Sequence, residues 1–284
     1  MDGVLLINKE KGMTSQKVLT KIKHILNVDK IGHCGTLDPI STGVLVCLLG
    51  KATKLSRYLL EENKCYKAKV LLGLRTDSFD ITGNVTGKKD NIKVTDFDID
   101  EVLNSFIGSI KQTPPIYSAI KVGGKKLYEY ARSGKDIEIE ERTVEIYDLK
   151  RTSNLINNEF EFEVFASKGT YIRSLIDDIG IKLNTFATML ELERIKAGKF
   201  GILDCYNLLD IEKGNYKIIS LQDALDLDSV TLNDNQYKKV INGGKLSLKE
   251  FDKLYDKMML LYEGELIAIY HREEGFYKSE VIWN

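Results

Sequence analysis

The sequence predicts a mixed α/β protein of the α+β class that ends in a small all-β domain. Strand-like and helix-like segments follow one another irregularly, without the strand–helix–strand repeat of a doubly wound fold. Near the C-terminus, a polar stretch at about 208–230 precedes short strand patterns such as LIAIYH and YKSEVIW. The chain has 284 residues, 43% of them hydrophobic, which suits one large domain and one small one.

The N-terminal part is predicted to form a strand, a helix, a buried strand and a second helix. The apolar run at residues 3–8 favours a short strand, and either Thr14 or Ser15 can cap the helix that follows. Apolar side chains then recur at helical spacing, namely Val18, Ile22, Ile25 and Leu26. The run at 43–49 lies between two glycines and is typical of a buried strand, whereas residues 51–62 have a helical pattern.

The middle of the chain is predicted to contain a strand, a helix and an exposed excursion. Residues 65–74 alternate enough to favour a strand, and the acidic segment 96–110 has a helical pattern. The apolar side chains on one side of this helix are Val102, Leu103, Phe106 and Ile110. Residues 111–142 then hold two of the three prolines, a Gly-Gly pair and three tyrosines among lysines. That composition predicts an exposed segment that does not belong to the core.

Two strands, a helix and a third strand are predicted after this excursion. Residues 143–149 and 158–166 favour strands, and in the second strand apolar residues alternate with glutamates, so one face should be wet. Thr170 can cap a helix that runs from about 171 to 183. Residues 188–196 again favour a strand.

The four cysteines form neither a metal-binding nor a disulfide pattern. They are irregularly spaced and include no C-x-x-C pair: Cys34, Cys47, Cys65 and Cys205. This spacing favours free thiols in a reducing compartment. The N-terminus has no basic segment followed by a long apolar one, and no apolar stretch reaches membrane-spanning length. We therefore expect a cytoplasmic protein that does not bind a membrane.

Charge is balanced over the whole chain but uneven along it. The formal net charge is −1, which does not by itself indicate a nucleic-acid binder. Basic residues nevertheless outnumber acidic ones at 51–75 and 121–135, while acidic residues gather at 96–101 and 136–141. A neutral total can hide a basic face that binds nucleic acid, although solvated helix and loop surfaces would give the same distribution.

The glycines around residues 43–51 do not form a phosphate-binding loop. A Walker A loop requires the spacing G-x-x-x-x-G-K-[ST], because that length lets backbone N–H groups surround the phosphates. Here six residues separate Gly43 from Gly50, and Ala52 stands where serine or threonine is required. Nucleotide hydrolysis is therefore not predicted.

Asp38 is the carboxylate with the most unusual setting. It precedes Pro39, which restricts Asp38 to extended backbone angles and cannot donate a backbone hydrogen bond. An aspartate in such a turn often only accepts hydrogen bonds from nearby N–H groups. The surrounding GHCGTLDPISTG is, however, dense in residues that permit close backbone approach and offer hydrogen bonds, which favours a functional loop.

Residues 32–39, closed by Gly43, resemble the catalytic loop of the tRNA pseudouridine synthase B family. Further segments resemble motifs of that family in its order: GVLLINKEKGMTS from residue 3, KCYKA at 64–68, QTPPIYSA at 112–119, GKKLYEYAR at 124–132, GTYIRSL at 169–175, and the block 192–200. Residues 240–244 and 264–270 resemble its small C-terminal domain. Three residues depart from the usual pattern, since Glu10, Cys34 and Asn184 stand where proline, threonine and glycine are common.

The resemblance implies a mixed-sheet catalytic domain over residues 1–212, with an RNA-clamping insertion at about 111–142, and a PUA-like RNA-binding barrel over 228–284. That barrel could instead serve only to pack on the catalytic domain. The implied reaction isomerises uridine 55 in the T-loop of tRNA to pseudouridine, by base flipping, cleavage of the N1–C1′ bond and rejoining through C5. It requires no cofactor or metal ion. The implied partner is the tRNA T-arm, bound by a monomer, with the insertion poorly ordered in the absence of RNA.

The resemblance also assigns roles in catalysis. Asp38 would attack C1′ of the sugar or abstract the C2′ proton, and Arg173 would hold its carboxylate bidentately and keep it ionised. Tyr66 would stack on the displaced uracil and help to remove the C5 proton. Tyr171 and Leu192 would line the pocket. The alternatives for Arg173 are a phosphate contact or a place on a helix surface.

Four further assignments concern binding of the RNA. His33 would fill the gap left by the flipped base, although a lone histidine is more often a core residue. Lys9, Lys64 and the lysines of 121–126 would contact phosphates, which adds affinity without reading sequence.

Three other activities remain compatible with the sequence. The first is a non-catalytic RNA chaperone that opens the T-arm in the same pocket. The second is a synthase that acts on another RNA, such as a guide-directed or messenger target. The third is a glycosidase that releases free uracil, although glycoside hydrolysis normally uses a second carboxylate and none stands near Asp38 in the motif.

Overall fold

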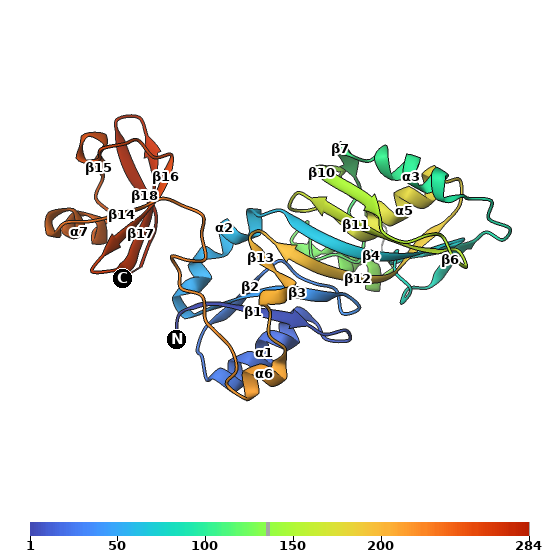
Figure 1. Ribbon diagram of the computed structural model, residues 1–284, viewed down its shortest axis with the longest axis horizontal. Helices are drawn as coiled ribbons and strands as arrows, with labels where there is room; N and C mark the ends of the chain where they lie inside the picture. Colours follow the sequence, from blue (N-terminus) through green and yellow to red (C-terminus); the bar gives the residue numbers. More distant parts are fainter. Residues whose placement is uncertain (135–136, 284) are drawn as a thin grey trace.

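The computed structural model describes residues 1–134 and 137–283. Most strands belong to two sheets, a nine-stranded one and a five-stranded one near the C-terminus. Figure 1 shows the second sheet, in orange to red, set apart from the first and joined to it by a coil. The predicted class, a mixed α/β domain followed by a small all-β domain, is confirmed. None of the helices in the described ranges is long and apolar enough to cross a membrane.

The nine-stranded sheet has the main order β1-β3-β12-β4-β11-β10-β7, with β2 beside β3 and β13 beside β12. The strands are β1 (Gly3–Lys9), β2 (Ile31–Cys34), β3 (Thr42–Leu49), β4 (Lys64–Leu72), β7 (Gly108–Gln112), β10 (Arg142–Arg151), β11 (Glu159–Ala166), β12 (Ala187–Ala197) and β13 (Phe200–Gly201). All pairs are antiparallel except β12–β3, which is parallel. The sheet is therefore mixed, and the parallel pair lies where its two halves meet.

That junction depends on one glycine. Gly43 of β3 lies opposite Arg194 of β12, and its φ of +99° belongs to the left-handed region. A Cβ atom at this position would come within 2.3 Å of the Arg194 carbonyl oxygen. Only glycine lets the two backbones approach this closely, so Gly43 is needed to join the half-sheet that carries the Asp38 loop to the other half.

Helices cover both halves of this sheet. In the β1–β3 half, α1 (Ser15–Leu26) and α6 (Leu208–Glu212) bury apolar side chains against one face, and η1 (Gly50–Leu55) and α2 (Ser56–Glu61) pack on the other. In the other half, α3 (Asp96–Asn104) and α5 (Ile172–Lys182) pack on the strands β4, β11, β10 and β12. Figure 1 shows α3 and α5 side by side. As predicted, Thr14 caps α1, accepting a hydrogen bond from the Lys17 N–H at 3.1 Å.

The helix predicted over 96–110 is shorter than expected. It ends at Asn104, and residues 108–112 form strand β7, in which Ile110 pairs with Val144 of β10. Gly108 has a φ of +106°, which ends the helical path and turns the chain into the sheet. The predicted strand 65–74 is also interrupted, because β4 ends at Leu72. The short β5 (Leu74–Thr76) leaves it to pair with β6 (Val85–Lys88).

The segment predicted to be an exposed excursion is only partly exposed. It contains β8 (Lys121–Val122), β9 (Lys125–Lys126) and α4 (Leu127–Arg132), with most lysines in solvent. Several of its residues are nevertheless buried: Gln112, Pro114, Pro115, Ser118 and Leu127. Residues 135 and 136, which belong to this predicted excursion and to the charged clusters, lie outside the described residues. The predicted dependence of its order on RNA stays a prediction.

The C-terminal sheet has the order β14-β16-β17-β18-β15. Its elements are β14 (Ser229–Thr231), α7 (Asp234–Ile241), β15 (Leu246–Ser247), η3 (Leu248–Glu250), β16 (Lys257–Tyr262), β17 (Glu265–Glu273) and β18 (Phe276–Ile282), and η2 (Ile202–Asp204) precedes them. Its last residues contact the large domain, since the indole N–H of Trp283 donates to the Lys51 carbonyl at 3.0 Å. Trp283, Leu266 and Ile269 also share a hydrophobic cluster with Leu48 and Leu55, which joins the two parts.

Candidate active site

The Asp38 loop connects β2 to β3, and hydrogen bonds hold its backbone in place. The Ser15 hydroxyl accepts a hydrogen bond from the Leu37 N–H at 2.9 Å and lies 3.2 Å from the Leu37 carbonyl oxygen. The carbonyl oxygen of Pro39 accepts from the Gly12 N–H at 2.7 Å, and the Ser41 N–H donates to the Asp38 carbonyl at 3.0 Å. These bonds fix the backbone on both sides of Asp38, so its carboxylate is presented in one place.

Arg173, in the first turn of α5, forms an ion pair with Asp38. Its Nε lies 2.9 Å from Oδ2 of Asp38, and the arginine side chain is 5% exposed. Nη1 donates to the Ser78 carbonyl at 2.9 Å, and Nη2 donates to the Tyr117 carbonyl at 2.9 Å. The predicted pair is present, but the predicted bidentate fork is not, because the terminal nitrogens bind backbone carbonyls. Asp80, 3.9 Å from Nη1, adds a second negative charge.

A cavity of about 270 Å³ opens beside this ion pair. Its wall includes Asp38, Tyr66, Tyr171, Arg173 and Leu192, so the structure brings together five side chains that the sequence singled out. Tyr66 on β4 lies opposite Arg194 of β12, and Ala68 lies opposite Leu192. Because side chains two residues apart share a face of a strand, Tyr66 and Leu192 both reach this side of the sheet. Their roles toward a base stay predictions.

Tyr171 is fixed by the side chain of Gln112. The Tyr171 N–H donates to Oε1 of Gln112 at 2.8 Å, and the Gln112 amide donates to the Tyr171 carbonyl at 3.1 Å. Gln112 belongs to β7 and is 2% exposed. Burial raises the pKa of the Tyr171 hydroxyl, so this tyrosine is neutral at physiological pH and can act as a packing surface or a hydrogen-bond donor.

The predicted phosphate contact of Lys9 is wrong. Lys9 is fully buried, at 0% exposure, and its ammonium donates to the carbonyl oxygens of Glu10, Met13 and Pro39. It also does not line the Asp38 cavity, so a phosphate bound there would not reach it. Burial lowers the pKa of Lys9 to about 8, although the negative charge of Asp38 partly offsets this effect. Lys9 therefore supports the Asp38 loop from within, through its contact with Pro39.

Lys64 and His33 lie at different distances from the cavity. Lys64 is part of its wall but is 7% exposed, and its ammonium donates to the carbonyl oxygens of Leu60 and Glu62. His33 is half-buried on β2 and is not among the residues that line this cavity. Burial, and secondarily the charge of Arg194, lowers the pKa of His33, which favours the neutral ring. Contacts of either residue with RNA stay predictions.

Two residues of the site were missed in the sequence. Asp80 is 5% exposed, and its Oδ1 accepts from the Thr82 N–H at 2.9 Å. Arg194 is 1% exposed, and it donates from Nε to the Val44 carbonyl at 2.7 Å and from Nη2 to the Gly35 carbonyl at 3.0 Å. A signal for Arg194 was present, because it follows Leu192 by two residues and so occupies an inward position of a strand. No comparable pattern marks Asp80.

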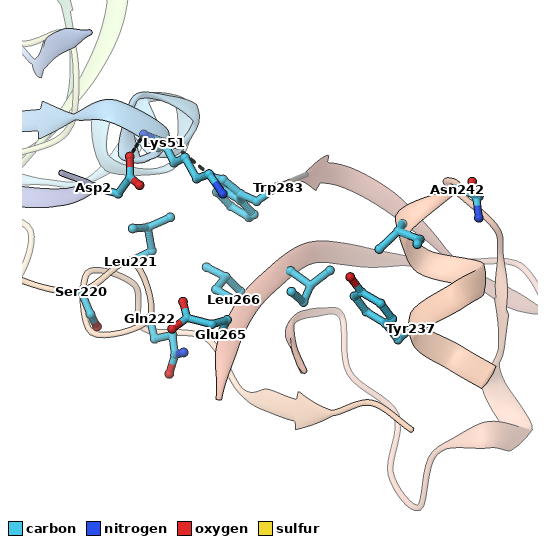
Figure 2. A pocket seen from close by; sticks show the side chains of 12 residues that line it. Asp2, Lys51, Ser220, Leu221, Gln222, Tyr237, Asn242, Glu265, Leu266 and Trp283 are labelled. Atoms are coloured by element: carbon cyan, nitrogen blue, oxygen red, sulfur yellow. Dashed lines mark hydrogen bonds between the residues drawn. The ribbon is translucent and has the colours of Figure 1, made fainter. Parts of the chain in front are cut away.

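A larger cavity, of about 870 Å³, lies between the two parts of the chain (Figure 2). Lys51 and Trp283 lie at one end of it, and Tyr237 of α7 and Asn242, directly after that helix, lie at the other. None of the side chains predicted for catalysis lines it. In residues 1–134 and 137–283, no group of three or more His, Cys, Asp or Glu side chains is placed to hold a metal ion. The Asp38 cavity is therefore the candidate active site.

Comparison with known proteins gives a consistent result. Residues 23–172 match the family described as "TruB family pseudouridylate synthase (N terminal domain)". The tRNA pseudouridine synthase B of Ligilactobacillus salivarius is 42% identical over 99% of this chain and 98% of its own length. That of Mesoplasma florum is 40% identical over 96% and 94%.

Solved structures are also similar. A Cbf5-Nop10-Gar1 complex contains a chain with a TM-score of 0.75 and 27% identity, over 99% of this chain and 84% of the other. An H/ACA RNP bound to a substrate RNA containing 2′-deoxyuridine contains one with a TM-score of 0.69 and 27% identity, over 95% and 77%. The matched residues include the Asp38 loop and extend to the start of α5. The chain belongs to the TruB family of pseudouridylate synthases.

Proposed function

We propose that this protein isomerises uridine 55 in the T-loop of tRNA to pseudouridine, with Asp38 as the reacting carboxylate. The names of the relatives, which match over nearly their whole length, support tRNA as the substrate. One structural observation carries the assignment of the site. The pinned carboxylate of Asp38, paired with Arg173, borders a cavity whose wall also includes Tyr66 and Leu192. A flipped pyrimidine ring fits this arrangement of one charge and two packing surfaces.

The reaction balances within the nucleotide. The N1–C1′ bond breaks, the uracil turns, and a C5–C1′ bond forms. C5 then loses its proton, and N1 carries one in the product. Asp38 acts on the sugar, either by attacking C1′ or by abstracting the C2′ proton, and its carboxylate is regenerated at the end. Tyr66 stacks on the detached uracil while it turns, and assists removal of the C5 proton.

Arg173 prepares the carboxylate for this step. Its Nε binds one oxygen of Asp38, and no other side chain in the described parts of the chain forms an ion pair with Asp38. The two terminal nitrogens are fixed by carbonyl oxygens of the segments around Ser78 and Tyr117. These contacts fix the guanidinium, which in turn holds the carboxylate in one orientation before the RNA binds.

The RNA would extend beyond the cavity over the rest of the molecule. We propose that residues 1–212 form the catalytic unit, that 111–142 clamp the RNA, and that 228–284 form an RNA-binding domain. The exposed lysines near the β8–β9 turn, Lys121 and Lys125, support this proposal, because exposed cations bind phosphates at little desolvation cost. In this proposal His33, beside the Asp38 loop, takes the place of the flipped base.

Asp38→Asn tests the chemistry. With tRNA that carries 5-tritiated uridine, we expect the variant to release no tritium above background, while its affinity for the RNA stays within about tenfold of the wild type. Asp29→Asn, an exposed aspartate after α1, is the matched control and should release tritium normally. Retained tritium release by Asp38→Asn would show that another group reacts with the sugar.

A second candidate is a synthase directed to its uridine by a guide RNA. The similarity to a chain of an H/ACA RNP favours testing it. A bare T-arm stem-loop separates the two, because a stand-alone tRNA enzyme should modify it without any other RNA. Treatment of the product with aniline tests the remaining alternative, since release of free uracil would leave abasic sites and cause strand scission.

A further inference from the structure

Arg194 and Lys64 lie together on one part of the wall of the Asp38 cavity and differ from Arg173 in their surroundings. Both are almost completely buried, at 1% and 7% exposure. Within residues 1–134 and 137–283, no carboxylate lies within 4 Å of either cation, whereas Arg173 has Asp38 and Asp80. Buried charges are costly unless they are paired. The carbonyl oxygens that accept their hydrogen bonds reduce this cost but do not neutralise the charge.

Both side chains keep donors for another partner. Arg194 uses Nε and Nη2 for the carbonyls of Val44 and Gly35, and its Nη1 has no protein hydrogen bond in the part of the chain that the structure describes. Lys64 donates to two carbonyls, which leaves one of its three N–H bonds. A guanidinium fixed through two nitrogens is rigid, and its remaining edge suits an oxyanion.

The position of these cations matches the geometry of a flipped nucleotide. Lys64 and Tyr66 both line the cavity from β4, and residues two apart on one strand face are about 6.6 Å from each other. Arg194 lies directly opposite Tyr66 on β12. A nucleotide whose base stacks on Tyr66 can place a phosphate beside the neighbouring wall, because the covalent links through the sugar keep the phosphate close to the base.

We propose that Arg194 and Lys64 form a buried phosphate subsite, which binds a phosphate adjacent to the flipped uridine and supplies the negative charge that this end of the cavity lacks. The inference rests on the proposed function, because it assumes an RNA nucleotide in the cavity. Burial, and secondarily the charge of Arg194, lowers the pKa of Lys64 to about 8 in the free protein, and the more distant charges of Glu62 and Glu61 offset only part of this effect. A bound phosphate would reverse this effect.

The test removes the charge from the RNA rather than only from the protein. T-arm stem-loops are made with a neutral methylphosphonate at one of the two phosphates that flank the target uridine, or at a phosphate in the stem. Affinities are measured for the wild type and for Lys64→Met. Lys213→Met, at an exposed lysine outside both the proposed catalytic unit and the proposed RNA-binding domain, is the matched control. Arg194→Lys provides a second variant, and thermal unfolding verifies that each protein is folded.

We expect one flanking methylphosphonate to weaken binding by the wild type about tenfold. Lys64→Met should lose a similar factor of affinity for the native RNA. The methylphosphonate should weaken binding by this variant little further, because the contact that it removes is already missing. Lys213→Met should behave like the wild type. Two results would overturn the subsite, provided that native stem-loops are still modified. In the first, the loss of affinity caused by Lys64→Met and the loss caused by the methylphosphonate add up at both flanking positions. In the second, the wild type loses no affinity for either substituted RNA. If the native stem-loop is not modified at all, the proposed function itself fails.

Discussion

Two buried arginines, Arg173 and Arg194, line the same cavity but differ in their hydrogen-bond and ion-pair partners. Arg173 is surrounded by groups that complement it: Asp38, Asp80 and the carbonyl oxygens of Ser78 and Tyr117. Among residues 1–134 and 137–283, Arg194 has only carbonyl partners, and its cationic neighbours include Lys64. The charge of Arg173 is therefore compensated before substrate binds, whereas the charge of Arg194 is not. The difference separates a site prepared for chemistry from a site prepared for a ligand.

Loss of Arg173 should have the largest effect, and it should fall on the rate. In Arg173→Lys, one ammonium cannot hold Asp38 and also satisfy the carbonyls of Ser78 and Tyr117. We expect the single-turnover rate of tritium release to fall about 10²- to 10³-fold, with a small change in affinity. Arg57→Lys, at an exposed arginine, is the control. A loss of affinity without a loss of rate would remove the distinction between the two arginines.

Loss of Arg194 should show the opposite pattern. Arg194→Gln removes the charge but keeps an amide that can donate to one carbonyl. We expect the affinity for a T-arm stem-loop to fall about tenfold, and the rate at saturating RNA to change less than that. Fluorescence anisotropy and single-turnover assays on the same preparation give both quantities. An unchanged affinity with a rate as low as that of Arg173→Lys would contradict a role in binding phosphate.

The pH dependence of binding should give a smaller effect. The pKa of Lys64 is about 8 in the free protein and should be higher with a phosphate beside it, so RNA binding takes up a proton. The affinity of the wild type should therefore fall as pH rises from 7 to 9, by up to about tenfold. Lys64→Arg keeps its charge and should show a flatter profile at constant ionic strength. Lys9, whose pKa is also lowered to about 8 by burial, is present in both proteins, so the difference between their pH profiles reports on Lys64.

The sequence predicted the reacting pair better than the groups that support it. Asp38 and Arg173 lie 135 positions apart, and only their motifs pointed to a contact that the structure then places at 2.9 Å. The motifs could not show that Ser78 and Tyr117 would occupy the terminal nitrogens through backbone atoms, because any residue can supply a carbonyl. Lys9 was assigned to phosphate together with the other lysines of the motifs, and its burial could not be read from the sequence because lysines are rarely buried.

The fold was predicted where periodicity was long and regular. The alternation of β11 and the helical spacing of α1 both appear as expected. The helix predicted over 96–110 failed after Asn104 because Ile110 fits a helical face and a strand face equally well. The deciding feature, the positive φ of Gly108, belongs to the folded backbone. The burial of Gln112 accompanies hydrogen bonds to the backbone of Tyr171, a partner that lies far away in the sequence.

A structure of Asp38→Asn bound to a T-arm stem-loop tests the central claim most directly. We predict that the target uracil lies in the cavity between Tyr66 and Leu192, with its sugar beside residue 38 and one of its flanking phosphates on Arg194 and Lys64. A complex in which the uridine stays stacked in its loop, or enters the cavity with its phosphates facing solvent away from both cations, would contradict the account.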